Sequence, residues 1–362
     1  MRLIIVCALL LLPWVADAAN NITIGPAELL YSDAQMPLTM DGSFATLRRD
    51  ATTVYVWHTF GTETAKYFGP LNAPLQMQVW LKGQSQLWNM NGFDGTPWLY
   101  NVYEVSPGGP LLGFIHRENG LGPPFEIGMG YSTDGGDNWT YLGDILKPQC
   151  DQQNPGGVPY LVVGSYFYVY FNEWPLPCGT QKRMGVVRAL VADVVAAAAN
   201  GQVVPWKKHS NGAWTEDGFT GVASNIIADE ASDEAYDFHA DAAYSTALGK
   251  YIITLDHYTL GQLLLYTSLD GVTWSERTVV DQAPDPTYTQ PYSSIVGLSG
   301  GVANDMHIVD SDFYIIYPRK NQRVDYNYDE LYRRRITIDA PLPPTPDVPT
   351  GVTLPEPQSV KL

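Results

Sequence analysis

Short apolar runs alternate with polar turns along most of the chain, and the pattern is most regular between residues 98 and 146. Aromatic and β-branched residues fill four segments there, and clusters of glycine, proline and asparagine separate them. This alternation is typical of β-strands joined by tight turns. The predicted strands are Trp98–Glu104, Leu111–Glu118, Glu126–Ser132 and Trp139–Leu146. Four strands in so short a stretch form an antiparallel meander the size of a propeller blade.

Similar runs before and after this meander predict four further blades. The first blade is less regular, with strands in Gly42–Phe60 and Gln76–Lys82 and turns at 49–51 and 61–74. The third blade contains Val158–Val163, Tyr166–Glu173 and Val203–Trp206. The fourth blade contains Ala240–Ser245, Tyr251–His257, Gln262–Ser268 and Trp274–Val280. The fifth blade contains Met306–Val309, Phe313–Pro318 and Glu330–Ile338, and we expect residues around 22–31 to close it, because paired termini remove exposed sheet edges.

One segment of the third blade changes period. Apolar residues between 187 and 199 recur at the spacing of one helical face, and Gly201 is a typical residue for the end of a helix. The face consists of Val187, Leu190, Val191, Val194, Val195 and Ala198. We therefore expect one short surface helix inserted into an otherwise all-β chain.

Two turns share a sequence pattern. Residues 132–139 fit S-x-D-x-G-x-x-W, the Asp-box of sialidase-like propellers, and residues 268–274 form a copy that is one residue shorter. In such a turn the short acid accepts hydrogen bonds from backbone N–H groups, and glycine adopts a positive φ. We interpret both boxes as structural turns rather than catalytic sites. Asp134 and Asp270 lie 136 positions apart, which is two blade lengths of about 68 residues, so five blades fill the chain.

The beginning of the chain indicates export. Arg2, the apolar run Leu3–Val15 and an A-x-A site at 16–18 are typical of a signal peptide. We expect this signal at residues 1–18, a propeller at 19–339 and a Pro-rich tail or linker at 340–362. Secretion to an extracellular or periplasmic space favours a disulfide between Cys150 and Cys178, the two cysteines that remain after the signal.

Charge narrows the possible partners. The chain has 38 acidic and 21 basic residues, a formal charge of −17. This charge argues against nucleic acid and anionic membranes as partners. Aromatic residues make up 12 % of the chain and suit a carbohydrate partner, and we expect a monomer. No ligand spacing specifies a metal, although Ca²⁺ or another divalent ion in the channel is compatible with the acidic residues.

With five blades and two Asp-boxes, the chain resembles the five-bladed β-propeller carbohydrate-active enzymes, the furanosidase-like glycoside hydrolase clans. The W-x-N-D-P-N hallmark of the invertase-like branch is absent, and residues 91–95 are only loosely similar to it. The resemblance implies a secreted enzyme that degrades a plant, algal or microbial polysaccharide or oligosaccharide. It also implies an Asp base on the first blade, a helper Asp and a Glu acid. By position, the base would be Asp94 or Asp41, the helper Asp241 and the acid Glu118 or Glu173.

Blade geometry predicts where these residues meet. The starts of first strands and the ends of second strands lie on one face of a propeller, and the Asp-boxes lie on the other. The predicted first-strand starts hold Asp41, Asp94, His239 with Asp241, and Asp305 with His307. The predicted second-strand ends hold His58, His116 with Glu118, Glu173, Asp256 with His257, and Arg319. Five of the six histidines fall in these windows, and this clustering is the main functional signal.

Three functions fit this face. Hydrolysis of a glycosidic bond needs two carboxyl groups, with Trp98 and Tyr100 available for stacking against a sugar ring. Elimination next to a uronic acid needs a base such as His239, His257 or Tyr258, and Arg319 would neutralise the substrate carboxylate. A non-catalytic glycan-binding propeller is the third. We rank hydrolysis first and elimination second.

Overall fold

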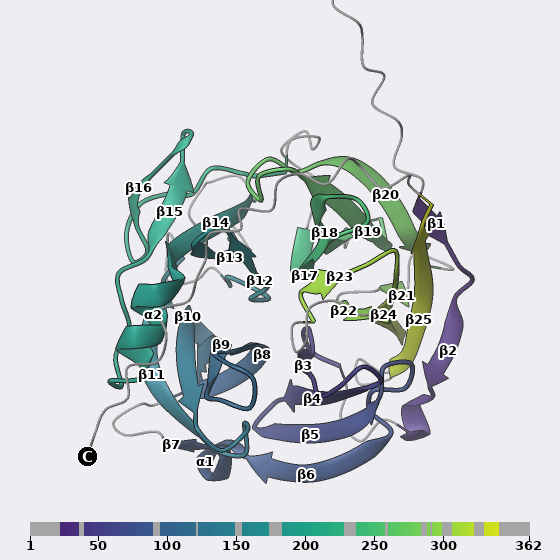
Figure 1. The fold of residues 1–362 in the computed structure, drawn as a ribbon, viewed down its shortest axis with the longest axis horizontal. Helices are drawn as coiled ribbons and strands as arrows, with labels where there is room; N and C mark the ends of the chain where they lie inside the picture. Colours follow the sequence, from purple (N-terminus) through teal and green to yellow (C-terminus); the bar gives the residue numbers. More distant parts are fainter. Residues whose placement is uncertain are drawn as a thin grey trace, which may run out of the picture.

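Five β-sheets surround a central axis in the computed structural model of the chain, and each sheet is one blade of a propeller (Figure 1). The structure describes residues 22–35, 40–89, 95–120, 122–148, 154–173, 183–227, 237–257, 260–283, 288–289, 292–298, 306–321 and 329–339. The predicted all-β, five-bladed architecture with antiparallel blades is confirmed. The signal peptide, the tail, Cys150 and Cys178 lie outside the described residues, so the signal and the disulfide stay predictions.

The main strands of each blade are antiparallel and follow chain order from the axis outwards. Blade one comprises β3 (Ala45–Arg48), β4 (Thr53–Phe60), β5 (Glu63–Pro70) and β6 (Met77–Gly83). Blade two comprises β8 (Thr96–Glu104), β9 (Leu111–Asn119), β10 (Gly122–Ser132), β11 (Trp139–Leu146) and, parallel to β11, the short β7 (Trp88–Asn89). Blade three comprises β12 (Tyr160–Val163), β13 (Tyr166–Glu173), β14 (Arg183–Leu190), β15 (Lys207–Ser210) and β16 (Ala213–Asp217).

The other two blades contain strands from distant parts of the chain. Blade four comprises β17 (Asp237–Ser245), β18 (Lys250–His257), β19 (Gln262–Ser268), β20 (Ser275–Gln282) and, parallel to β17, β23 (Ile308–Val309). Blade five comprises β21 (Tyr288–Thr289), β22 (Ser294–Gly297), β24 (Asp312–Asn321), β25 (Asp329–Ile338), β1 (Ile22–Ile24) and β2 (Glu28–Tyr31). The described helical segments are α1 (Gln84–Leu87), α2 (Val191–Ala198) and the 3₁₀ turn η1 (Asp33–Gln35).

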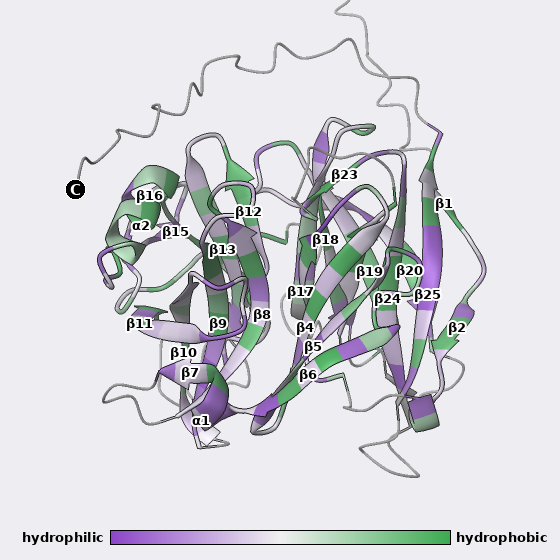
Figure 2. Cartoon of the chain, turned by 60° about the horizontal axis from the view of Figure 1, so that its bottom comes forward, coloured by the Kyte–Doolittle hydropathy of each residue, from purple (hydrophilic) through white to green (hydrophobic). Residues whose placement is uncertain are grey.

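The two ends of the described chain close the ring. Strands β1 and β2 both pair antiparallel with β25, and Thr23 lies opposite Thr337. The predicted closure by N-terminal residues is therefore confirmed. Three consecutive arginines make β25 hydrophilic over much of its length (Figure 2), and each pairs with an acid from a different element. The pairs are Arg333 with Glu28, Arg334 with Asp281, and Arg335 with Asp312.

Buried apolar side chains hold neighbouring blades together. In the described part of the chain they form five clusters, and each cluster lies between two adjacent blades. Phe114 of blade two, for example, stacks on Tyr160 of blade three with ring centroids 4.7 Å apart. Burial of apolar area between the sheets is the main stabilising contribution in such an arrangement. Because every blade shares a core with both of its neighbours, the stability of each blade depends on the blades beside it.

Three predicted elements were wrong in their bounds. The turn predicted at 61–74 contains β5, whose polar residues Thr64 and Lys66 are buried and conceal the strand pattern. The helix begins at Val191 rather than Val187, since residues 183–190 form β14. The strand predicted at Val203–Trp206 is irregular backbone, and β15 follows it.

The prediction of the first strand of blade five was also wrong. The innermost strand is β22, which pairs with β24, whereas the predicted strand around Ile308 pairs with β17 of blade four. The prediction followed the apolar run Met306–Val309, whereas the buried strand β22 of the same length begins with the polar residue Ser294. Tyr292, not Asp305, therefore stands just before the first strand of blade five.

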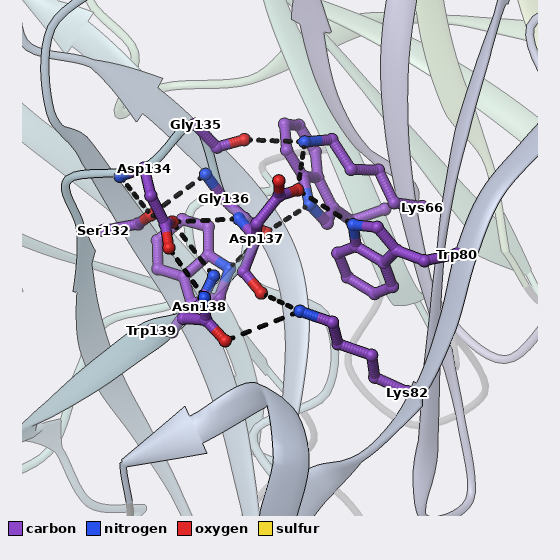
Figure 3. A network of polar contacts seen from close by, with 11 residues as sticks. Lys66, Trp80, Lys82, Ser132, Asp134, Gly135, Gly136, Asp137, Asn138 and Trp139 are labelled. Atoms are coloured by element: carbon purple, nitrogen blue, oxygen red, sulfur yellow. Dashed lines mark hydrogen bonds and ion pairs between the residues drawn. The ribbon is translucent and has the colours of Figure 1, made fainter.

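The two box turns connect neighbouring blades. In the first, Asp134 Oδ1 accepts hydrogen bonds from the backbone N–H groups of Asp137 (3.1 Å) and Asn138 (3.0 Å). Trp57 of β4 donates its indole N–H to the carbonyl oxygen of Gly136 (3.0 Å). Lys66 of β5 donates to the carbonyl oxygen of Gly135 and to Asp137, as Figure 3 shows. The turn of blade two is thus attached to blade one.

The second turn repeats this attachment on blade three. Asp270 Oδ1 accepts hydrogen bonds from the N–H groups of Val272 (2.8 Å) and Thr273 (2.7 Å). Tyr170 of β13 donates its hydroxyl to the carbonyl oxygen of Gly271 (2.8 Å). Tyr170 occupies the fifth position of a second strand, as Trp57 does in blade one. The predicted capping by the box acids is present in both turns.

Candidate functional site

Strand direction places the candidate residues on one face of the ring. Each first strand is antiparallel to its second strand, so the start of one lies beside the end of the other. The box turns follow the ends of third strands β10 and β19, on the opposite side of the sheets. We call the first side the funnel face and the second side the box face.

Asp41 stands at the funnel face, just before blade one. The Tyr292 hydroxyl donates to Asp41 Oδ1, and the Tyr100 hydroxyl donates to the Asp41 carbonyl oxygen (2.9 Å). Gly42 follows with φ of 130°, a conformation that favours glycine. A Cβ at this position would lie 2.0 Å from Cε1 of Tyr100. The close approach of the Tyr100 ring to the backbone therefore fixes where Asp41 lies.

Glu118 stands at the end of β9 in the neighbouring blade. Its Oε1 lies 3.2 Å from Nε2 of His116, and its side chain is 14 % exposed. The His116 ring is stacked between Tyr100 and Phe125, with centroid distances of 6.0 Å and 5.9 Å. This stack leaves the imidazole little freedom to turn, so His116 positions the carboxylate of Glu118.

Tyr100 connects the two carboxylates. Burial raises its pKa well above the usual value, and the negative charges of Asp41 and Glu118 raise it further. The phenol therefore stays protonated at neutral pH and remains a hydrogen-bond donor. Both charges act on one phenol, so Asp41 and Glu118 are both near Tyr100, at the same face of the propeller.

Asp241 lies deeper, on the inner strand of blade four. Its carboxylate accepts hydrogen bonds from the N–H groups of Ala242 (2.9 Å) and Ile295 (2.7 Å), and the residue is 4 % exposed. Burial raises the pKa of Asp241 to about 6, although the charge of His307 and the two N–H donors lower it. A carboxylate so enclosed can act on a substrate only through its charge or through its neighbours.

Two predicted histidines, His58 and His307, are buried and contact other residues. His58 is buried, and its ring meets Phe44 edge-on at 5.0 Å. His307 is buried as well, and its Nε2 lies 2.7 Å from Oδ1 of Asn101 in blade two. Since Asn101 in turn donates to the Val158 carbonyl oxygen (2.9 Å), His307 connects blade four to blades two and three.

The predicted residues of blades four and five face other partners. Arg319 donates to Asp281, whose side chain is fully buried, and Arg334 binds the same carboxylate. The guanidinium of Arg319 also lies 4.2 Å from the centroid of the Tyr332 ring. Asp256 and His257 are both buried at the end of β18. The charge of Arg319 is therefore matched within the interface between blades four and five.

The remaining predicted residues are Trp98, which is buried, and five residues whose side chains the structure does not describe. Trp98 is buried beside Tyr100, with centroids 6.4 Å apart, and its indole N–H has no hydrogen-bond partner within the described chain. His239 lies in β17 and Glu173 ends β13, but the structure does not describe their side chains. Asp94, Tyr258 and Asp305 lie outside the described residues.

Tyr292 is the residue that sequence reasoning missed. It precedes β22, so only the correct first strand of blade five would have drawn attention to it. Among the described residues, no group of three or more His, Cys, Asp or Glu side chains could hold a metal ion. Within the same residues, no helix has the length and apolar character to cross a membrane.

The molecule is a five-bladed propeller that brings two carboxylates, Asp41 and Glu118, and the hydroxyl of Tyr100 close together at one face. Solved structures share the fold: the catalytic domain of a GH62 α-L-arabinofuranosidase from Coprinopsis cinerea matches with a TM-score of 0.51 and 9 % identity. The match covers 89 % of this chain and 98 % of that one. The α-L-arabinofuranosidase PaAbf62A from Podospora anserina, solved with cellotriose, matches with a TM-score of 0.52 and 9 % identity over 90 % and 98 % of the two chains. The expected likeness to five-bladed glycoside hydrolases is thereby confirmed for the fold. No family model and no curated sequence matches the chain.

Proposed function

We propose that the protein is a secreted glycoside hydrolase that cleaves a polysaccharide or oligosaccharide at the funnel face. The observation that carries this proposal is that two carboxylates from neighbouring blades, Asp41 and Glu118, both lie near the buried phenol of Tyr100. Hydrolysis of a glycosidic bond needs one carboxyl group as acid and one as base or nucleophile. The arabinofuranosidases of the same fold support a carbohydrate as the substrate.

The two carboxyl groups have different surroundings, which suggests their roles. Asp41 accepts a hydrogen bond from the Tyr292 hydroxyl, which holds the carboxylate in place for the role of a base. In the proposed step, Asp41 takes a proton from water while the water oxygen attacks the anomeric carbon. Glu118 gives its proton to the leaving oxygen as the glycosidic bond breaks. His116 positions Glu118, and Asp241 contributes only its charge or its support of β22.

The pair also predicts the stereochemical outcome. Asp41 and Glu118 are carried by different blades, and carboxylates on separate elements suit the wider separation of about 6.5–9.5 Å that inverting enzymes use. We therefore expect inversion at the anomeric carbon. Proton NMR of the first-formed sugar distinguishes the two anomers before they interconvert, and a product with the anomeric configuration of the substrate would contradict this assignment.

Product analysis tests the reaction class. The protein is incubated with neutral and uronic-acid glycans, and the products are separated while absorbance is followed in the ultraviolet band of unsaturated uronides. Reducing ends without this absorbance are expected, and Asp41→Asn should abolish them. Absorbing products would identify a polysaccharide lyase instead. Retention of a glycan without any product would identify a glycan-binding propeller.

A further inference from the structure

A pocket lies on blade two, at the box face. It has a volume of about 400 Å³ and lies between the first box turn and the segment of α1 and β7 (residues 84–89) that leads into the blade. Figure 1 shows this segment outside β11, at the outer rim of the ring. The pocket forms because β7 pairs with the start of β11, with Asn89 opposite Thr140.

The lining combines aromatic surface with uncharged polar groups. Asn89, Thr133 and Thr140 line the pocket and are exposed, and their side chains form no hydrogen bond within the part of the chain that the structure describes. Trp88 and the half-buried Tyr131 line it as well. Trp88 is 3 % exposed, and its indole N–H has no partner among the described residues. Amides and hydroxyls beside aromatic rings can bind sugar hydroxyls and pack against the apolar face of a sugar ring.

The acid of this pocket is not available for catalysis. Partial burial acts to raise the pKa of Asp134, but hydrogen bonds from Asn138, Ser132 and the Asp137 N–H lower it. Its two oxygens are occupied by the Ser132 hydroxyl, two backbone N–H groups and the Asn138 amide. Asp134 therefore stays ionised as part of the turn. The pocket has the groups for binding and lacks a free acid.

The pocket is separate from the funnel. Phe125 stacks on His116 at the funnel face, and Tyr131 lies six residues further along β10. At about 3.3 Å per residue, six residues of strand span roughly 20 Å. The sugar units that occupy the pocket therefore do not contact Asp41 or Glu118.

We propose that this pocket is a non-catalytic binding site for a neutral saccharide, formed by Asn89, Thr133, Thr140, Tyr131 and Trp88. Taking a saccharide as the ligand rests on the proposed function. The site holds a second stretch of the same polymer at the rim of the disc while the funnel acts on another. Binding at this site prolongs the association of the enzyme with a polymer. It leaves the rate of reaction on a short substrate unchanged.

The test compares binding with turnover in matched variants. Asn89→Ala with Thr140→Ala removes two pocket groups, and Gln76→Ala with Gln78→Ala removes two exposed amides of blade one as the control. Thermal unfolding first establishes that both variants are folded. Retention is measured by electrophoresis in gels that contain soluble arabinoxylan or β-1,3-galactan, and turnover is measured on a short chromogenic glycoside and on the polymer.

The pocket variant is expected to bind at least one polymer 3-fold or more weakly than the control, with unchanged kcat/KM on the short glycoside. Retention equal to that of the control would overturn the proposal, as would a wild-type protein that neither polymer retains. Failure of the proposed function looks different: neither substrate would be turned over, while retention that depends on Asn89 and Thr140 would persist.

Discussion

Aspartates on the two faces of the propeller are held in opposite ways. On the box face, Asp134 and Asp270 accept several hydrogen bonds near solvent, and these bonds lower the pKa of each carboxyl despite partial burial. On the funnel face, Asp241 also accepts two N–H hydrogen bonds, yet burial raises its pKa to about 6. The number of donors alone therefore does not set the charge state. Access to water decides between a permanently ionised anchor and a group that titrates near neutral pH.

The largest expected effect concerns the funnel face. Glu118→Gln removes the proposed acid and should lower kcat by a factor on the order of 10² to 10⁴. The loss should shrink for substrates with good leaving groups, which need little protonation, and the thermal midpoint should barely move. Steady-state kinetics on two leaving groups measures this. The exposed Glu63→Gln on blade one is the control, and equal activity of the two variants would remove Glu118 from the mechanism.

The second largest effect is expected at Asp281, a buried carboxylate with cationic partners. Asp281 is fully buried and binds Arg319 and Arg334. Asp281→Asn leaves two arginines without their counter-charge and should lower the free energy of unfolding by about 3–5 kcal/mol. Chemical denaturation measures the change. A loss below about 1 kcal/mol would mean that the interface of blades four and five does not depend on this charge.

The raised pKa of Asp241 predicts a dependence of stability on pH. Well below pH 4 the Asp241 carboxyl is protonated in both the folded and the unfolded chain. Between about pH 4 and 6 the unfolded chain ionises first, so wild-type stability falls as pH rises. Asp241→Asn lacks this titration. The stability of wild type relative to the variant should fall by roughly 3 kcal/mol from pH 3.5 to pH 7. A difference that is constant with pH, or that rises, would show an ordinary pKa.

The smallest expected effects are those of substitutions in the two box turns. Asp134→Ala and Asp270→Ala each remove a turn cap and should cost about 1–2 kcal/mol of unfolding free energy, as the loss of a helix cap does. Turnover of the folded fraction should be unchanged, because the boxes lie opposite the funnel. Denaturation curves and active-site-normalised kinetics measure both quantities. Inactivity of a fully folded Asp134→Ala protein would show that the two faces are coupled.

Much of the fold could be predicted because its signals are local and repeat. Apolar runs between turn residues located most strands, and the spacing of the two boxes led to five blades. The failures occurred where tertiary contacts override the local pattern. Lys66 lies inside a strand because its ammonium binds Gly135 and Asp137 of the next blade. No local pattern contains such a contact.

The candidate site was predictable only in part for the same reason. Asp41 and Glu118 followed from strand starts and ends, a rule that depends on the architecture alone. Tyr292 did not, because its blade was assigned the wrong inner strand. The surroundings of Arg319 also depend on Asp281, which lies on another blade, so its matched charge could not be read from its neighbours in the sequence.

The closure of blade five affects the order in which the protein can form. Thr23 pairs with Thr337, 314 positions later, so one of the earliest described strands has to wait for one of the last to be synthesised. Chain length itself adds little to the equilibrium cost, since each doubling of a loop costs only about 0.6 kcal/mol. The penalty is in time, because contacts so distant in sequence form slowly. A chain that ends before residue 329 lacks β25. In such a chain β1 and β2 therefore have no partner strand, and the ring stays open.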